Sequence, residues 1–219
     1  MNTHQVILLL VVLAILILSL AIHEAAHAFV ARMCGDDTAE REGRLTLNPI
    51  VHIDPFMTIL LPLVLFLGSN GSFVFGGAKP VPVNPHRLRN PSRDMMYVAL
   101  AGPISNFLIA IFLVLITKGL FYFAGFPNDS LLISALWSGI MLNIFLAVFN
   151  MLPIPPLDGS RVVMHFLPQS QKQGYAQVER FGIFVVLGLF YLVPGFSTLL
   201  QTGALKIFRL LDLLTGGNW

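Results

Sequence analysis

The chain has 219 residues, of which 56% are hydrophobic, 11% carry a formal charge and one is a cysteine, and its net charge is +2. A typical soluble domain is about 45–50% apolar and about 25% charged, so a soluble fold of this composition could not cover its apolar surface. The composition therefore excludes disorder, a nucleic-acid-binding protein and a cysteine-built structural zinc site, and it predicts a polytopic membrane protein.

Four apolar runs are long enough to cross a membrane, because a transmembrane helix needs about 20 mostly apolar residues. In chain order these runs are Val6–Ala31, Met95–Phe123, Leu131–Leu152 and Phe181–Leu200. No basic residue precedes the first run, which predicts a retained helix and not a cleaved signal peptide. We therefore expect four full transmembrane helices.

Three shorter segments predict other elements. The run Phe56–Leu67 is only about a dozen residues long and contains Pro62, which favours a short re-entrant segment. Residues 43–48 and 72–75 alternate like strands and predict a small β-hairpin. Residues 204–214 alternate apolar and charged side chains at helical spacing and predict an amphipathic interfacial helix.

Basic residues gather in three loops and suggest an orientation. These loops follow the first helix, follow the short apolar run, and separate the last two spans, and they hold Arg32, Arg41, Arg44, Lys79, Arg87, Arg89, Arg93, Arg161, Lys172 and Arg180. The positive-inside rule places such loops in the cytoplasm. No polar stretch is long enough for a separate soluble domain, so residues 1–219 predict a single membrane-embedded domain in the cell membrane.

The end of the first helix contains the pattern His-Glu-x-x-His at residues 23–27. Positions four apart lie on one helix face, so His23 and His27 can reach one metal ion, and Glu24 lies close enough to contact a metal-bound water. Two imidazoles, a carboxylate and an open water position suit a hydrolytic zinc site. Ionisable side chains are costly within a membrane helix, which favours this interpretation over simple packing.

A catalytic zinc site usually has three protein ligands. The candidates for the third are His52, Asp54, His86, Asp158 and His165, with His4 less favoured. Asp158 follows prolines that end the preceding helix, and irregular backbone at membrane depth is tolerated only beside protein or a wet cavity. The alternative is that Asp158 caps a helix that starts near Ser160.

Three motifs together carry a family resemblance: His-Glu-Ala-Ala-His at 23–27, Ala-Gly-Pro-Ile-Ser-Asn at 101–106, and the segment 150–159, Asn-Met-Leu-Pro-Ile-Pro-Pro-Leu-Asp-Gly. In their order and spacing the chain resembles the site-2 protease family of intramembrane zinc metalloproteases, in its small form without accessory domains. The resemblance implies an all-α polytopic membrane protein with a small membrane-associated β-hairpin.

The resemblance also implies the roles of individual residues. His23, His27 and Asp158 would bind one Zn²⁺ ion, Glu24 would be the catalytic base, and Asn150 would position or stabilise the reacting carbonyl. The expected function is a zinc metalloendopeptidase that cuts transmembrane protein substrates in regulated intramembrane proteolysis, with its active site toward the cytoplasm.

Two other functions fit part of the same pattern. In a membrane metal-ion transporter or metal-binding protein, the histidines and the aspartate would line an ion path. An inactive scaffold would only bind transmembrane helices. Glu24 separates these alternatives, because hydrolysis needs a base beside the metal and transport does not.

Overall fold

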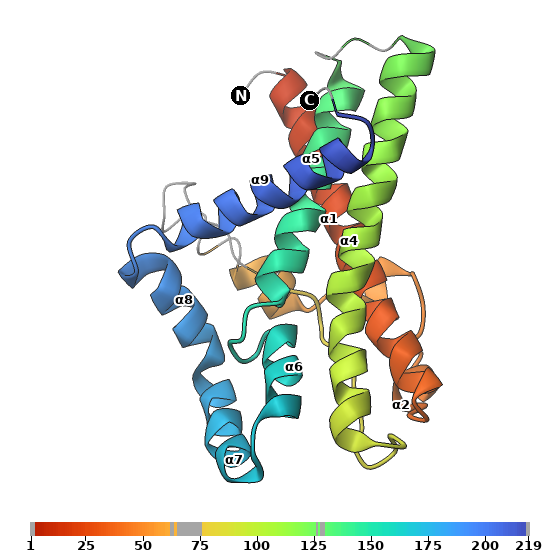
Figure 1. The fold of residues 1–219 in the computed structure, drawn as a ribbon. Helices are drawn as coiled ribbons and strands as arrows, with labels where there is room; N and C mark the ends of the chain where they lie inside the picture. The colour runs from red at the N-terminus through yellow and green to blue at the C-terminus, as the bar shows by residue number, and fades with distance from the viewer. Residues whose placement is uncertain (1–2, 62–63, 65–75, 126, 128–129, 218–219) are drawn as a thin grey trace.

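The computed structural model describes the chain except for residues 1–2, 62–63, 65–75, 126, 128–129 and 218–219. In the described part the chain is built of helices, and it contains no strand. The long helices are α1 (Thr3–Met33), α4 (Pro91–Ala124), α5 (Leu131–Asn150) and α9 (Phe196–Leu214) (Figure 1). The shorter ones are α2 (Thr38–Arg41), η1 (Pro49–His52), η2 (Pro55–Leu60), α6 (Asp158–Phe166), α7 (Gln169–Val178), η3 (Glu179–Phe181) and α8 (Gly182–Leu192).

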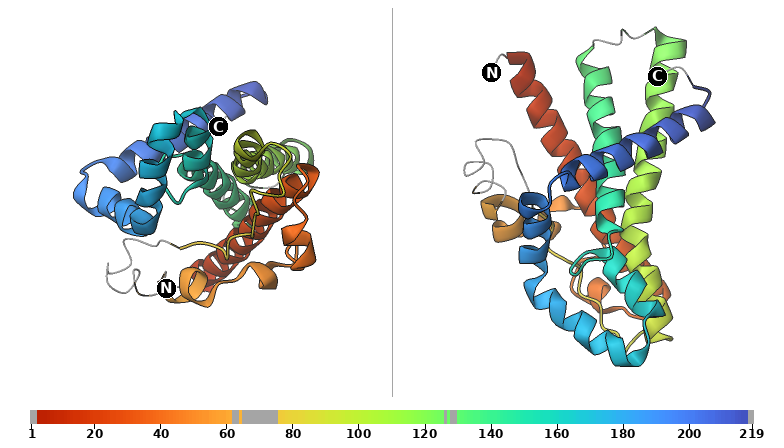
Figure 2. Two further views of the ribbon diagram at one scale, coloured as in Figure 1. Left: turned by 90° about the horizontal axis from the view of Figure 1, so that it is seen from below. Right: turned by 60° about the vertical axis from the view of Figure 1, so that its left-hand side comes forward.

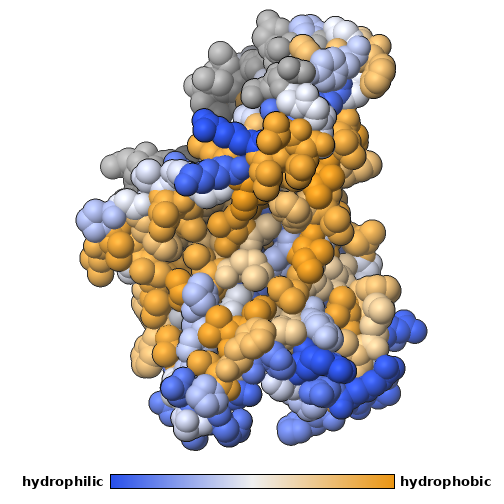
Figure 3. All heavy atoms as spheres, viewed as in Figure 1, coloured by the Kyte–Doolittle hydropathy of each residue, from blue (hydrophilic) through white to orange (hydrophobic). Residues whose placement is uncertain are grey.

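Four stretches are long and apolar enough to cross a membrane, as the sequence predicts. They are Val6–Met33, Pro91–Ala124, Leu131–Asn150 and Gln169–Leu192. Figure 3 shows apolar side chains over the middle of the molecule and hydrophilic side chains gathered at the end that carries α2, α6 and α7. The chain is therefore a multi-pass membrane protein with one markedly polar end.

The ends of the central helices are specified locally. The Asn90 side chain accepts a hydrogen bond from the Arg93 N–H and Pro91 occupies the first turn, which starts α4. Gly125 ends α4 in the left-handed conformation, with φ of 65°. Ser130 caps α5 in the same way as Asn90 caps α4. These caps place two long helices side by side with a short connection between them.

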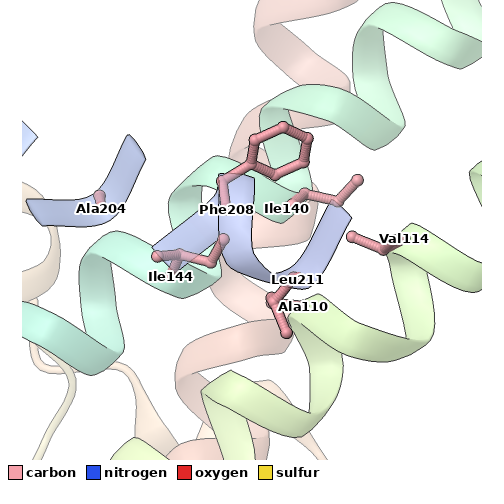
Figure 4. Close-up of a cluster of buried hydrophobic side chains, with 7 residues drawn as sticks. All are labelled: Ala110, Val114, Ile140, Ile144, Ala204, Phe208 and Leu211. Carbon is pink, nitrogen blue, oxygen red and sulfur yellow. The ribbon is translucent and has the colours of Figure 1, made fainter. Parts of the chain in front are cut away.

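Helices α1, α4 and α5 pack against one another, and α9 lies across α5 and α4 (Figures 1 and 2). Figure 4 shows the apolar cluster where α4, α5 and α9 meet, formed by Ala110, Val114, Ile140, Ile144, Ala204, Phe208 and Leu211. Residues 204–214 are thus amphipathic, as predicted, and their apolar face is buried against the bundle. The helix that carries them is longer than expected, because it starts at Phe196.

The predicted fourth span, Phe181–Leu200, is wrong in its extent. Helix α8 ends at Leu192, and α9 starts at Phe196 in a different direction. Pro194 has no N–H to continue a helix, and Gly195 has a φ of 80°, which side-chain-bearing residues rarely adopt. The spanning stretch instead runs through α7, η3 and α8.

The predicted hairpin is not confirmed. Residues 43–48 form turns and bends, and the N–H of Asn48 donates to Oγ1 of Thr46, a local bond that competes with strand pairing. Residues 72–75 lie outside the described residues. The predicted re-entrant segment Phe56–Leu67 begins as helix η2, whose N-cap Asp54 accepts from two N–H groups, and its second half lies largely outside the described residues.

Candidate metal centre

Two histidines of α1 and one aspartate of α6 meet inside the bundle. The Nε2 atoms of His23 and His27 lie 3.1 Å apart, and they lie 3.2 Å and 3.4 Å from Oδ2 of Asp158. His23 and His27 are 5% and 7% exposed. The His-x-x-x-His spacing brings the imidazoles together on one helix face. The carboxylate comes from Asp158, which is 131 residues beyond His27 in the chain. These three side chains form the candidate metal centre.

The second nitrogen of each imidazole has an acceptor as its partner. Nδ1 of His27 lies 2.6 Å from the carbonyl oxygen of Val98, which can only accept. Nδ1 of His23 lies 2.6 Å from Oδ1 of Asn106. Each Nδ1 therefore carries a proton and donates it, so that in the neutral imidazole Nε2 is left with a lone pair.

A chain of buried amides fixes the orientation of His23. Nδ2 of Asn143 donates to the carbonyl of Gly139 and to Oγ of Ser19, and Oδ1 of Asn143 accepts from Nδ2 of Asn106. Because the Gly139 carbonyl can only accept, the orientation of both amides is determined, and Asn106 must turn its oxygen toward His23. Both asparagines have 0% exposure. Such partners set the tautomer and the direction of a ligating imidazole.

The geometry fits a metal ion. In a tetrahedral zinc site with bonds of about 2.0–2.1 Å, the ligand atoms lie about 3.3–3.4 Å apart, close to the distances found here. Without a cation, two lone pairs and a carboxylate oxygen would repel one another at this separation. Oδ2 of Asp158 is buried and has no hydrogen-bond donor, although it lies between the two imidazoles. The donor set, two imidazoles and one carboxylate, is one that zinc prefers.

The Asp158 carboxyl is ionised at neutral pH. Burial raises its pKa, but where an imidazole of His23 or His27 carries a proton on Nε2, the hydrogen bond and the positive charge outweigh burial and lower the pKa to about 2. A carboxylate must be deprotonated to bind a metal. The charge therefore suits a ligand.

The connection between α5 and α6 places Asp158. Helix α5 ends at Asn150, and a proline-rich turn leads back to Asp158, which is the first residue of α6. A Cβ at Gly159 would lie 2.3 Å from the Met151 carbonyl oxygen, so glycine is needed for α6 to start this close to the end of α5. The alternative that Asp158 caps a helix is wrong, because the N-cap is Leu157 and no side chain caps this helix.

Gly102 of α4 lies directly against both imidazoles. A Cβ at this position would come within 2.4 Å of Cε1 of His23 and of Nε2 of His27. The glycine in the 101–106 motif therefore allows the α4 backbone to form one wall of the site. The close packing of this motif therefore lies at the candidate metal centre.

Glu24 is buried beside the cluster, with 9% exposure. Its Oε2 accepts a hydrogen bond of 2.8 Å from the N–H of Val81, in an irregular segment between η2 and α4. The sequence did not indicate this partner, because it lies 57 residues away and is a backbone group.

The remaining candidates lie elsewhere. Nδ2 of Asn150 donates to the carbonyl of Leu146 one turn earlier in α5, and Asn150 is half-buried. Nε2 of His52 pairs with the Thr46 carbonyl, Asp54 caps η2, and Nδ1 of His165 lies 3.0 Å from Oγ of Ser92. Among the described residues, the group of three or more potential ligands that could hold a metal is His23, His27 and Asp158.

The fold and the site define a class: a multi-pass membrane protein with a buried group of two histidines and one aspartate that could hold a metal ion, and a glutamate beside it. The model of peptidase family M50, the site-2 protease family, matches residues 11–126 and 120–193. These matches cover most of the chain, so the chain belongs to peptidase family M50. The family resemblance inferred from the motifs is thereby confirmed.

Several relatives carry metalloprotease names. The "Putative zinc metalloprotease YwhC" of Bacillus subtilis is 39% identical over 207 residues, which cover 91% of this chain and 90% of the relative. The "Putative zinc metalloprotease Rip2" of Mycolicibacterium smegmatis is 34% identical over 185 residues, which cover 82% of this chain and 66% of the relative. The "Putative zinc metalloprotease MJ0611" of Methanocaldococcus jannaschii is 33% identical over 145 residues, 64% of this chain and 62% of the relative. No solved structure matches the chain.

The expected enzyme class and cofactor agree with these findings. The family is one of peptidases, and the relatives are named for zinc. The prediction of a zinc metalloprotease is therefore confirmed at the level of the class.

Proposed function

We propose that the protein is an intramembrane zinc metalloendopeptidase that hydrolyses peptide bonds in or near transmembrane segments of its substrates. The observation that carries this proposal is the triangle of His23, His27 and Asp158, whose ligand atoms lie 3.1–3.4 Å apart within a bundle of apolar helices. A site of this kind, buried between membrane-spanning helices, is accessible to substrates that are themselves in the membrane.

The three side chains hold Zn²⁺ through Nε2 of His23, Nε2 of His27 and the Asp158 carboxylate. Bound there, zinc would polarise the scissile carbonyl and lower the pKa of a bound water toward neutrality. Asn106 and the Val98 carbonyl keep both imidazoles in the tautomer that presents Nε2.

Glu24 is the general base. Its place directly after His23 and three residues before His27 puts its carboxylate on the same side of α1 as the ligands. It accepts a proton from the attacking water and returns one to the leaving amine, as a general base that becomes a general acid. Because one of its oxygens is held by the Val81 N–H, the other is left for this proton.

Asn150 contributes to the same reaction as a donor for the reacting carbonyl. Its Nδ2 now donates to the Leu146 carbonyl at the end of α5, directly before the turn that leads to Asp158. An amide has two donor hydrogens, so a second one is left for a substrate oxygen. Donors of this type stabilise the negative charge that develops during attack.

Residues 1–219 act as one membrane-embedded protease domain in the cell membrane, with the active site toward the cytoplasm. Supporting this, His27 lies five residues before Arg32, which is about 7–8 Å along the helix axis, so a water path from the polar end is short. The positive-inside rule places that end in the cytoplasm. Figure 3 locates the hydrophilic surface at the same end.

We propose that the run Phe56–Leu67 is a re-entrant segment that does not cross the membrane. Two basic loops, one before and one after this run, favour the same side for both of its ends.

Cleavage of a model transmembrane substrate by purified protein in detergent tests the proposal. Glu24→Gln keeps the size of the side chain but removes the base, so it is expected to retain zinc and to lose about 10³-fold or more of the cleavage rate. Glu42→Gln makes the same change at an exposed position and serves as the matched control. Zinc content is measured in both variants by elemental analysis.

Undiminished cleavage by the Glu24→Gln variant would contradict the assignment of the base. Zinc transport gives the competing outcome. Proteoliposomes that take up zinc at the same rate with Glu24 and with Gln at position 24, and that show no cleavage in either case, would support an ion path and overturn the protease proposal.

A further inference from the structure

The segment between η2 and α4 contains an irregular stretch, residues 76–85, which we call the proline loop. It has neither helical nor strand structure before residue 85 and reads Gly-Gly-Ala-Lys-Pro-Val-Pro-Val-Asn-Pro. Each proline fixes its own φ near −65° and biases the residue before it toward an extended conformation. The proline loop is therefore stiff, although it has no regular secondary structure.

Buried or half-buried groups fasten the first part of the proline loop. The Gly77 N–H donates to the Met57 carbonyl at 3.0 Å, and Oγ1 of Thr58 donates to the Gly77 carbonyl at 2.6 Å. The Lys79 N–H donates to the His52 carbonyl at 2.8 Å. Elements η1 and η2 thus hold this end.

Two further side chains complete the attachment. Nη2 of Arg44, which is only 6% exposed, donates to the Lys79 carbonyl at 2.6 Å. At the other end, Oδ2 of Asp36 accepts from the Asn84 N–H at 2.6 Å, and Asp36 is fully buried with 0% exposure. A buried arginine and a buried aspartate are costly unless they are paired, and here each is paired with the backbone of this loop.

The middle of the proline loop is bonded to Glu24 of α1. The Val81 N–H donates to Oε2 of Glu24 at 2.8 Å. Pro80 and Pro82 have no N–H, so Val81 offers the single backbone donor between Lys79 and Val83. The two prolines thus leave one donor in the middle of a stiff loop that is anchored at both ends, and this donor is bonded to the proposed base.

We propose that the main-chain N–H of Val81 is a positioning group for Glu24. This inference rests on the proposed function, and it adds that the proline loop orients the carboxylate of the base. A glutamate has three side-chain torsions, and a charge-assisted hydrogen bond from a fixed backbone group selects one orientation among them. The buried pairs of Asp36 and Arg44 then serve catalysis at a distance, because they hold the loop that holds Glu24.

Val81→Pro tests this directly, because it removes the donor and keeps an extended backbone. The expected result is a kcat lower by about 10-fold or more, with full zinc content and an unchanged thermal midpoint. KM is expected to change by less than about 3-fold, because substrate binding is not the step affected. Val83→Pro inserts a proline two residues further along the same loop without touching the donor, and it should cleave as the unmodified protein does. Val81→Ala keeps the N–H and should lose far less than Val81→Pro.

A spectroscopic readout needs no substrate. The infrared carboxylate band of Glu24, taken as the difference between the protein and its Glu24→Gln variant, is expected to shift in Val81→Pro and not in Val83→Pro. If Val81→Pro fails to fold or loses zinc, an ester at position 81, introduced as the α-hydroxy analogue of valine, replaces only the N–H and is judged by the same measurements.

Each outcome decides between the two proposals. The positioning role is overturned if a folded variant without the donor, either the proline or the ester, cleaves like Val83→Pro and leaves the carboxylate band in place. Loss of cleavage in Glu24→Gln would still support the protease in that case. If the unmodified protein and Glu24→Gln cleave equally, the assignment of Glu24 as the base fails, and if neither cleaves while both take up zinc, the proposed function itself fails.

Discussion

The helix bundle buries two clusters of ionisable groups, and they are built in opposite ways. In the first, His23, His27 and Asp158 bring acceptor atoms within 3.4 Å of one another with no donor between them. In the second, Nζ of Lys118 on α4 lies 2.7 Å from Oδ1 of Asp212 on α9. It also lies within 3.2 Å of the carbonyl oxygens of Asp212, Thr215 and Gly217.

The difference between the two clusters distinguishes a structural ion pair from a candidate functional site. The ammonium of Lys118 has more acceptors than it has protons, and its partner carries the opposite charge, so this cluster is complete as it stands. It fastens the end of α9 to α4. The histidine cluster needs a positive charge between its converging acceptors, carried either by a metal ion or by a proton on an imidazole. Burial alone therefore does not mark a functional site, whereas acceptors that converge without donors do.

We expect the largest loss of zinc and of activity in Gly102→Ala, which disturbs the first cluster. The added Cβ would lie 2.4 Å from imidazole atoms of both histidines, so the rings must move and the metal site is lost. We expect zinc below detection and no cleavage. Alanine is about 1 kcal/mol better than glycine within a helix, so a simple loss of helix stability would not explain this result.

Gly119→Ala is the matched control on the same helix, because a Cβ there would meet nothing within 4 Å. This variant is expected to keep both zinc and activity. Full zinc content in Gly102→Ala would contradict the position assigned to the site.

Lys118→Met removes the cation of the second cluster, and it should lower the free energy of unfolding without changing zinc binding. It leaves the Asp212 charge buried without its cation, which is expected to lower the free energy of unfolding by about 3–5 kcal/mol. Thermal unfolding in detergent measures this loss, and zinc content per folded molecule should stay constant. Lys206→Met, at an exposed position of α9, should change little.

The double variant Lys118→Met with Asp212→Leu sharpens the same comparison. Replacing both charges by apolar side chains should recover most of the stability, because the cost lies in the unpaired charge. If the double variant is no more stable than Lys118→Met, the lost stability does not come from the unpaired charge of Asp212.

Asn106→Ala is expected to act on the metal with a smaller effect. It removes the acceptor for Nδ1 of His23, and loss of such a partner typically lowers metal affinity by about 10–100-fold. Competition with a zinc chelator measures the affinity. Asn84→Ala is the matched control. It also removes a side-chain amide, but one that does not contact the histidines, and its backbone N–H can still donate to Asp36. Equal zinc affinities in these two variants would contradict the role of Asn106.

Ser19→Ala removes the hydroxyl that accepts from the buried amide of Asn143, and it should have the smallest effect on zinc affinity. Nδ2 of Asn143 keeps its bond to the Gly139 carbonyl, so the amide orientation is retained. One neutral hydrogen bond contributes about 0.5–1.5 kcal/mol, and we expect a zinc affinity within about 10-fold of the unmodified protein. A loss as large as that of Asn106→Ala would show that the chain acts as a unit.

Local patterns were sufficient to predict much of this architecture. Apolar length predicted four spans, and the spacing of His23 and His27 predicted a shared ligand face. The fourth span was misplaced because hydropathy continues through Pro194 and Gly195, whereas the helix does not. Strand-like alternation at 43–48 was overridden by a local turn at Thr46.

The partners of the site could not be predicted in the same way. Asn106 bonds His23 and Asn143 bonds Asn106, so these contacts join three helices. The donor to Glu24 is a backbone group, so no residue type signals it. Tertiary contacts of this kind leave no periodicity in the sequence. Asp158 could be placed near a wet interior from its prolines, but its contact with the histidines required the fold.

X-ray absorption at the zinc edge of the purified protein tests the central claim most directly. The account predicts one zinc per chain with two imidazole ligands and oxygen ligands at about 2.0–2.1 Å, and loss of this signal in His23→Ala. A sulfur ligand, or an imidazole signal that persists unchanged in His23→Ala, would contradict it.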